Sequence, residues 1–144
     1  MDRVKIVFPE TVPLYETNVP VRISDVNYGG HLGNDAVLSL VHEARMQMLA
    51  ALGFTELDCG GAGLIMADAA IAYKSEAFYG EVLRIRIYAS EISTRSFSLL
   101  YRIQKGIDDV DVAHIRTGMA SFDYRARHIT AVPAPLMLFL HGGI

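Results

Sequence analysis

The chain has 144 residues, of which 51% are hydrophobic and 20% are charged, and its formal net charge is −3. A chain of this length and composition builds a single core, so we expect residues 1–144 to form one domain. The composition argues against a disordered chain, and the slightly negative charge argues against nucleic acid as the main partner.

The termini and the single cysteine indicate in which cellular compartment the protein is expected. Cys59 has no second cysteine with which to form an internal disulfide, which is typical of a reducing environment. The N-terminus, MDRVKIVFPE, lacks the apolar stretch of a signal peptide, and the run from Leu136 to Leu140 is far shorter than a membrane span. We expect a cytoplasmic protein with no membrane-spanning segment.

The first predicted strand covers residues 15–23. Apolar or β-branched side chains alternate there with polar ones, and this period of two predicts a half-buried strand. Pro20 lies within it and gives the ladder no N–H donor, so the strand belongs at the edge of a sheet. The preceding KIVF, residues 5–8, is a candidate partner strand, with PETVP as the turn.

Residues 24–35 read SDVNYGGHLGND and follow this strand. Gly29 and Gly30 predict a sharp turn or a close approach of the backbone to another group, because glycine takes positive φ freely. Asp25, Asn27 and His31 bring hydrogen-bonding and titratable groups to the same turn. The segment is either an ordinary turn or the rim of a site.

A helix is predicted next, with Asn34 or Asp35 as its N-cap and Gly53 as its stop. Apolar residues recur at helical spacing, and few polar side chains interrupt them: Ser39, His42, Glu43, Arg45 and Gln47. A helix that is apolar on most sides is normally enclosed by the rest of the fold. We therefore expect this helix to be surrounded.

The remainder of the chain, from Gly63, has the pattern of long strands. Segments 64–78, 82–90, 96–105 and 110–124 are joined by short turns, which predicts an antiparallel sheet. Gly118 is a candidate for a bulge. One enclosed helix and a long curved antiparallel sheet wrapped around it make an α+β architecture.

This layout resembles the hotdog fold, and VRISDVNYGGHLGNDAVLSLVHEAR resembles the 4-hydroxybenzoyl-CoA thioesterase branch of hotdog acyl-CoA thioesterases. The matching positions are Arg22, Gly30, His31, Asn34, Glu43, Ala44 and Arg45. YKSEAFYGE at residues 73–81 is similar to a further family segment, although Ala77 and Phe78 stand where proline is usual. The resemblance covers roughly residues 21–133. It implies acyl-CoA hydrolysis by a homodimer or homotetramer, with coenzyme A as part of the substrate and no separate cofactor.

One position departs from the family pattern. The catalytic carboxylate of these enzymes usually lies four residues before the histidine of the turn, where this sequence has Asn27, and the nearest acid is Asp25. An amide cannot act as nucleophile or general base near neutral pH. Hydrolysis would then take its carboxylate from elsewhere, with Asn27 orienting water or substrate.

The resemblance places the substrate at the turn and the start of the helix. The backbone N–H groups of Gly30 and His31 would hold the developing oxyanion, because a helix start is electropositive and its first donors lack intrahelical partners. Tyr28 and Gly29 would contact the substrate, and the His31 ring would bond the thioester carbonyl or a carboxylate. The alternative is a glycine turn that binds nothing, with His31 fixing the loop.

Three carboxylates are candidates for the base or for substrate contact. Glu43 lies in an otherwise apolar helix, where loss of water makes a carboxylate more basic; the alternative is a salt bridge to Arg45 or Arg102. Asp25 is either catalytic or an acceptor for loop N–H groups. Asp68 interrupts LIMADAAIA and either faces the same cleft as Glu43 or is an exposed strand residue.

Basic residues and possible metal ligands complete the candidates. Lys74 is a candidate for binding the phosphates of coenzyme A, and so are the arginines scattered over the strands. The alternative is that these basic side chains are simply exposed to water. Cys59 and the histidines at 114, 128 and 141 lack metal-ligand spacing, so we expect no metal.

The sequence therefore predicts hydrolysis of acyl-CoA thioesters, with water activated by Glu43 or Asp25. One alternative is a hotdog enoyl-CoA hydratase, because Asp25-Val26-Asn27 before His31 is similar to the Asp-x-Asn-Pro-x-His run of those enzymes. The other is a non-catalytic acyl-CoA binding protein, which the absence of an acid at position 27 favours. The apolar tail APLMLFL is expected to cover a subunit interface or an acyl channel.

Overall fold

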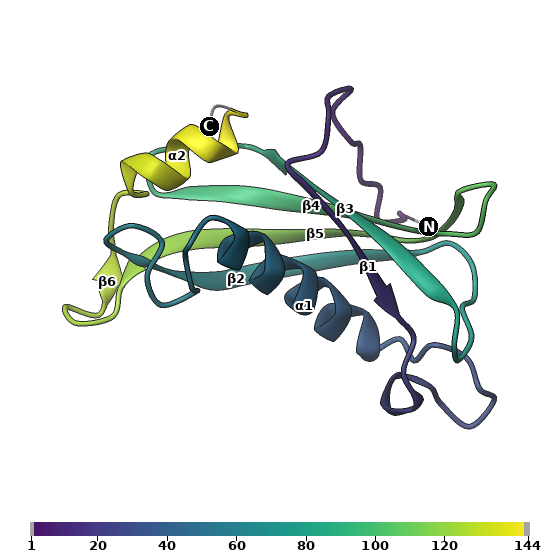
Figure 1. The fold of residues 1–144 in the computed structure, drawn as a ribbon. Coiled ribbons are helices and arrows are strands. Elements are labelled where there is room, and N and C mark those ends of the chain that lie inside the picture. Colours follow the sequence, from purple (N-terminus) through teal and green to yellow (C-terminus); the bar gives the residue numbers. More distant parts are fainter. Residues whose placement is uncertain (1, 143–144) are drawn as a thin grey trace.

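The computed structural model describes residues 2–142 and confirms a curved antiparallel sheet with a long helix against it (Figure 1). In chain order the elements are β1 (Tyr15–Pro20), a 3₁₀ turn (Ile23–Asp25), α1 (Ala36–Ala51), β2 (Gly63–Tyr73), β3 (Val82–Ser90), β4 (Ser96–Lys105), β5 (Val110–Asp123), β6 (His128–Ile129) and α2 (Ala134–Leu140). The strand order is β1-β3-β4-β5-β2, with β6 paired to β5. Every pairing is antiparallel, so the predicted α+β architecture is confirmed.

β1 lies at an edge of the sheet, as Pro20 predicted. It pairs with β3 alone in the strand order, and its last residue, Pro20, lies opposite Val82. The chain then leaves the sheet and turns through Ile23–Asp25 toward the start of α1. This change of direction delivers the glycine turn to one end of the sheet.

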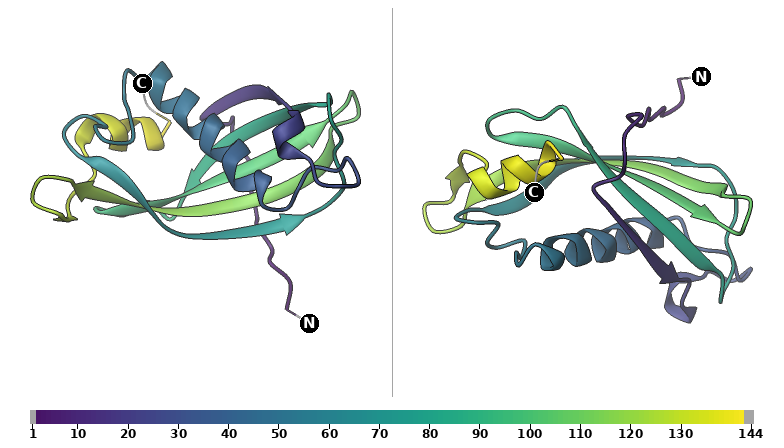
Figure 2. Two further views of the ribbon diagram at one scale, coloured as in Figure 1. Left: turned by 90° about the horizontal axis from the view of Figure 1, so that it is seen from below. Right: turned by 45° about the horizontal axis from the view of Figure 1, so that its top comes forward.

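The prediction that residues 5–8 form a partner strand is wrong. Residues 2–14 contain no strand, and the segment lies on the side of the sheet opposite α1 (Figure 2). Phe8 packs there against Tyr88 and His114, with ring centroids 5.4 and 5.0 Å away. β1 already occupies the edge of β3, and Pro9 and Pro13 remove two N–H donors from the segment, so packing on the sheet face replaces strand pairing.

α1 packs on β1 and β3, and the curved sheet covers one of its sides. The buried positions are Val37, Leu40, Val41, Ala44, Arg45, Met48 and Leu49. Ser39, His42, Glu43 and Met46 are exposed. The near-complete enclosure expected from the apolar sequence is therefore not reached in the single chain, which leaves one face of α1 open.

The apolar tail forms α2 and packs on the core of its own chain. Leu136, Phe139 and Leu140 are buried in that core, whereas Leu138 is 57% exposed. The expectation that the tail covers a subunit interface or an acyl channel stays a prediction. Neither α1 nor α2, in the described part of the chain, combines the length and hydrophobicity that crossing a lipid bilayer requires.

Candidate functional site

The glycine turn is closed by its own backbone and by Asn27. The N–H of Gly30 donates to the carbonyl of Asn27 at 3.0 Å, and the N–H of Gly29 donates to the Asn27 side chain at 3.1 Å. Gly30 has a φ of +77°, which explains the glycine there. The Gly30 N–H is thus already used within the turn, so the His31 N–H is the remaining donor of the pair proposed for an oxyanion. Tyr28, at the tip, is fully exposed.

Asp25 is a buried acceptor beside this turn. Its carboxylate accepts the backbone N–H of Arg22 at 2.9 Å and the Arg22 guanidinium at 3.1 and 3.3 Å, and its side chain is 5% exposed. The hydrogen bond that Arg22 donates to Asp25 also raises the pKa of Arg22. These contacts use both carboxylate oxygens to hold the 3₁₀ turn together, which agrees with the structural alternative for Asp25.

His31 lies beside the connection between β2 and β3. Its Nδ1 atom is 3.1 Å from an oxygen of Glu76, and its ring centroid is 4.9 Å from that of Phe78. A Cβ added at Gly29 would lie 2.8 Å from Cδ2 of this ring. The imidazole therefore packs between Gly29 and Phe78, and its Nδ1 edge faces a carboxylate that the sequence did not single out.

A cavity of about 260 Å³ opens at the start of α1. Its walls come from the turn, the first turn of α1, the β2–β3 connection and β5: Leu32, Asn34, Val37, Tyr73, Lys74, Ser75, Glu76, Ala77, Val112 and Ala113. The hydroxyl of Tyr73 donates to the carbonyl of Asn34 at 3.1 Å and so ties the cavity wall to the helix start. Because the first N–H groups of a helix lack intrahelical partners, this end of α1 is electropositive.

Glu43 does not line this cavity. It lies on the exposed side of α1 and accepts a hydrogen bond from Gln47 at 2.7 Å, and Gln47 in turn contacts Thr17 of β1 at 2.5 Å. Neither Arg45 nor Arg102 is its partner, because these arginines bind Glu56 and Asp111. The structure thus separates Glu43 from the turn residues within one chain.

Arg45 joins a buried polar network on the opposite side of the helix. Its guanidinium donates to Glu56 at 3.1 Å and to the Tyr101 hydroxyl at 3.0 Å, and that hydroxyl lies 2.7 Å from Thr117. Glu56 also contacts His42 at 2.5 Å. Tyr101 and Thr117 are fully buried, so this network links α1 to the segment that follows it and to the sheet.

Asp68 lies on the sheet face away from α1. It is paired with Gly118, whose neighbours Thr117 and Met119 are buried on the α1 side. Its carboxylate binds Arg116 at 3.0 Å and is 61% exposed, and this hydrogen bond lowers the pKa of Asp68. The register shifts directly opposite Gly118, as the sequence predicted, and the extra residue lies in β2, between Met66 and Asp68. A Cβ at Gly118 would overlap the Asp68 carboxylate, which explains the glycine.

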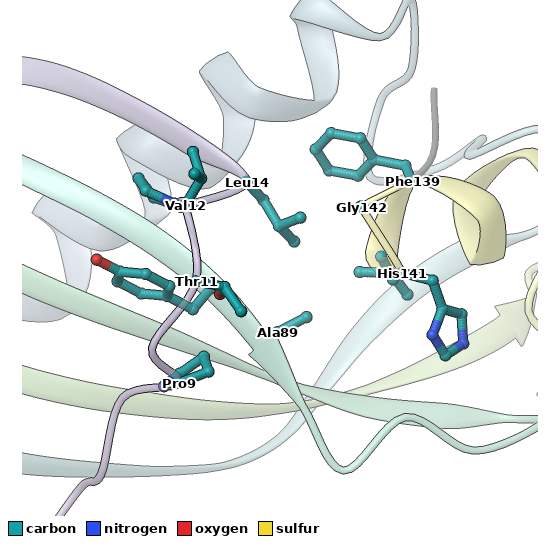
Figure 3. Close-up of a pocket in the computed structure, with 11 residues that line it drawn as sticks. Pro9, Thr11, Val12, Leu14, Ala89, Phe139, His141 and Gly142 are labelled. Atoms are coloured by element: carbon teal, nitrogen blue, oxygen red, sulfur yellow. The ribbon is translucent and has the colours of Figure 1, made fainter.

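A larger cavity, about 580 Å³, lies at the far end of β3, between residues 9–14 and the end of α2 (Figure 3). Val12 and Leu14 face the ring of Phe139 across it, and Ala89 forms part of its floor. Its walls are largely apolar and contain no carboxylate within the described chain. It therefore offers space and one imidazole, that of His141, but its lining is the end of α2 rather than a helix start, so the candidate chemistry stays at the start of α1.

Comparison with known proteins identifies the family to which the chain belongs. The sequence model of the thioesterase-like superfamily matches residues 21–140, which include the turn, α1, the whole cavity wall and α2. The chain belongs to the thioesterase-like superfamily. This membership supports thioester hydrolysis in general, in agreement with the predicted resemblance. No sequence among the curated proteins matches the chain.

Several solved structures share the fold of this chain. The 1,4-dihydroxy-2-naphthoyl-CoA thioesterase Slr0204 from Synechocystis is 18% identical with a TM-score of 0.79, over 88% of this chain and 95% of that chain. The gentisyl-coenzyme A thioesterase BH1999 is 19% identical with a TM-score of 0.76, over 88% and 99%. The protein SAV2348 from Staphylococcus aureus, solved in complex with CoA, is 12% identical with a TM-score of 0.79, over 95% and 90%. The predicted hotdog fold is confirmed.

The structure thus brings together some of the predicted residues and adds others. Asn27, Gly29, Gly30 and His31 form one turn, and Lys74 lines the adjoining cavity. Tyr28, Asp68 and Glu43 point elsewhere. Sequence reasoning missed Tyr73 and Glu76 as cavity residues, although both lie in YKSEAFYGE. The resemblance of that segment was the available signal.

Proposed function

We propose that the protein hydrolyses acyl-CoA thioesters to the free acid and coenzyme A. Superfamily membership supports thioester hydrolysis as the reaction class, and the CoA complex of SAV2348 supports coenzyme A as the thiol carrier. The observation that carries the proposal is the cavity at the start of α1, where an electropositive helix end meets polar side chains of the β2–β3 connection.

This cavity suits the carbonyl end of a thioester. The oxygen of the tetrahedral intermediate would lie at the positive end of the α1 dipole, near the His31 N–H, and the loss of one such donor typically costs ~10²–10³ in rate. Lys74 offers a positive charge at the wall for the anionic part of the substrate. Asn27 holds the turn that presents His31, because its side-chain oxygen accepts the N–H of Gly29.

We infer that two chains assemble through β2. This strand ends the strand order, so its second edge has no partner within residues 2–142, and its middle residues 66–69 are exposed. An unpaired edge of this length readily adds a strand from another chain. Two β2 edges paired about a two-fold axis would continue the sheet and close the open face of α1 with a second subunit. Native mass spectrometry distinguishes a monomer, a dimer and a tetramer.

The test of the function is thiol release from a panel of aliphatic and aromatic acyl-CoAs, followed with a thiol-reactive dye. Turnover of at least one substrate, with 1:1 formation of acid and coenzyme A, supports the proposal. Hydration of crotonyl-CoA without thiol release would instead identify an enoyl-CoA hydratase.

A non-catalytic acyl-CoA binding protein is the second candidate, and the amide at position 27 favours it. It predicts saturable binding of acyl-CoA by calorimetry, no thiol release by the wild type, and activity in the variant Asn27→Asp. A wild type that already turns substrate over excludes it.

A further inference from the structure

His31 and Glu76 form an imidazole–carboxylate pair at the edge of the α1 cavity, with Nδ1 3.1 Å from Oε2. We propose that His31 is the general base of the reaction and that Glu76 is its positioning residue, supplying the carboxylate that position 27 lacks. The inference rests on the proposed thioesterase function and adds the identity of the base.

The backbone holds the two residues in register. His31 and Phe78 form an antiparallel bridge, and the N–H of Leu32 donates to the carbonyl of Ala77 at 2.7 Å. Figure 1 shows the turn before α1 and the β2–β3 connection together at one end of the molecule. The carbonyl of Glu76 also accepts the Lys105 ammonium at 2.6 Å. Paired backbone therefore brings the two residues next to each other, and their side chains, 34% and 68% exposed, meet at the surface.

The opposite nitrogen, Nε2, lies on the ring edge beside Gly29. Nδ1 lies within ion-pair distance of Glu76, and a proton held on that nitrogen would leave on Nε2 the lone pair that a general base requires. A Cβ at Gly29 would lie 2.8 Å from Cδ2 and 3.2 Å from Nε2. Gly29 does not have a positive φ, so its backbone does not require glycine. An alanine at this position would instead force the His31 ring to shift.

The charges around the ring favour this role. Glu76 is the carboxylate in contact with His31 and also lines the cavity, so it stabilises the imidazolium that forms when the base takes a proton. Lys74 lines the same cavity, and Lys105 lies 5.4 Å from the centroid of Phe78, which packs on His31. The His31 side chain is 34% exposed, so water reaches it.

The proton and bond changes follow from this tautomer. His31 Nε2 takes a proton from a water molecule while the water oxygen bonds to the thioester carbonyl carbon, and the carbonyl electron pair moves to oxygen. When the carbonyl re-forms, the carbon–sulfur bond breaks and the thiolate leaves with the electron pair. The imidazolium then returns its proton to the thiolate. The products are the carboxylic acid and coenzyme A, and the base is regenerated.

The kinetic test compares His31→Gln, Glu76→Gln, Glu76→Asp, Gly29→Ala and Glu43→Gln with the wild type on the best acyl-CoA of the panel. We expect His31→Gln to lower kcat by ~10²–10⁴-fold and Glu76→Gln by about 10- to 100-fold, with KM little changed. Glu76→Asp should recover part of the loss, and Gly29→Ala should lower kcat as well. Glu16→Gln is the matched control, because it breaks the ion pair between Glu16 of β1 and Arg86 of β3, away from the cavity.

A measurement that does not depend on activity distinguishes failure of the proposed His31–Glu76 pair from failure of the proposed thioesterase function. Long-range ¹⁵N–¹H NMR of the wild type should show His31 as the Nδ1–H tautomer, and Glu76→Gln should reduce that preference while Glu16→Gln leaves it unchanged. A wild type that hydrolyses acyl-CoA while His31→Gln or Glu76→Gln keeps its kcat overturns the dyad and leaves the proposed function standing. Loss of activity in Glu43→Gln alone assigns the base to Glu43 and also overturns the dyad. A wild type inactive on the whole panel overturns both proposals, whatever the tautomer.

Discussion

Replacing Arg45 by methionine tests the buried network that joins α1 to the sheet. Methionine keeps an unbranched apolar stem but removes the charge, the donor to Glu56 and the donor to the Tyr101 hydroxyl. The Arg45 side chain is 6% exposed and that of Glu56 is 23% exposed. Methionine would therefore leave a largely buried carboxylate with a weaker set of partners.

The magnitude follows from these contacts. Breaking a buried ion pair by removing one partner costs ~3–5 kcal/mol. Glu56 keeps His42 at 2.5 Å and some contact with water, and Tyr101 keeps Thr117, so we expect a loss of about 2–3 kcal/mol. For a domain of this length, that loss lowers Tm by roughly 6–12 °C.

The assay is urea unfolding followed by circular dichroism at one fixed protein concentration, because assembly makes stability concentration-dependent. The matched control is Arg116→Met, which breaks the exposed pair with Asp68 and should cost less than ~1 kcal/mol. The double variant Arg45→Met/Glu56→Gln should recover part of the loss, because the unpaired carboxylate is gone. A loss for Arg45→Met no larger than that of Arg116→Met would refute the reasoning.

Three further predictions concern other parts of the chain. Gly63→Ala places a methyl carbon 2.8 Å from the carbonyl oxygen of Glu56 and against the ring of Tyr124. We therefore expect the free energy of unfolding, measured in urea, to fall by about 1–3 kcal/mol. An unchanged urea midpoint would contradict this close packing around Gly63. Asp25→Asn removes the negative charge of a carboxylate that accepts three hydrogen bonds from Arg22. It should lower the free energy of unfolding by about 1–3 kcal/mol. A variant with wild-type stability but a changed kcat would make Asp25 a catalytic candidate again. Burial lowers the pKa of His114, so the folded state binds fewer protons there than the unfolded state, and stability rises with pH. That contribution is fully present above about pH 6.5 and is lost as pH falls from there toward the lower folded pKa. His114→Gln should therefore flatten the decline in Tm between pH 7 and pH 5, and an equal decline in both proteins would count against the buried neutral ring.

The strands illustrate what local pattern determines. The predicted segments 82–90 and 96–105 coincide with β3 and β4. Buried and more exposed side chains alternate over most of β3, and in β4 the residues Phe97, Leu99, Tyr101 and Ile103 share one buried face, a period of two that favours a strand. The start of α1 and its end before Gly53, which has a φ of +77°, were also readable, since helix boundaries depend on neighbouring residues. The N-terminal segment shows where local pattern fails to predict structure. Residues 5–8 have a strand pattern but form no strand, because β1 already pairs with the edge of β3 and two nearby prolines lack N–H donors.

The candidate site divides in the same way. The turn with Asn27, Gly29 and His31 was visible in the sequence because its residues are consecutive. The partner of His31 was not visible, because Glu76 is 45 positions away and reaches the ring only through the bridge between the turn and the β2–β3 connection. Glu43 shows the converse, since its place in an apolar helix suggested burial, whereas the single chain leaves that face of α1 open.

By itself, the amino-acid order determined the helix, the long strands and the glycine turn, because each depends on backbone preferences and side-chain periodicity within a few residues. Only the tertiary structure decided which side chains meet: Arg45 with Glu56 and Tyr101, Asp68 with Arg116, and His31 with Glu76. Such pairs depend on strand order and register, which bring distant segments within hydrogen-bond reach. The reactivity of a side chain at a site depends on those neighbours.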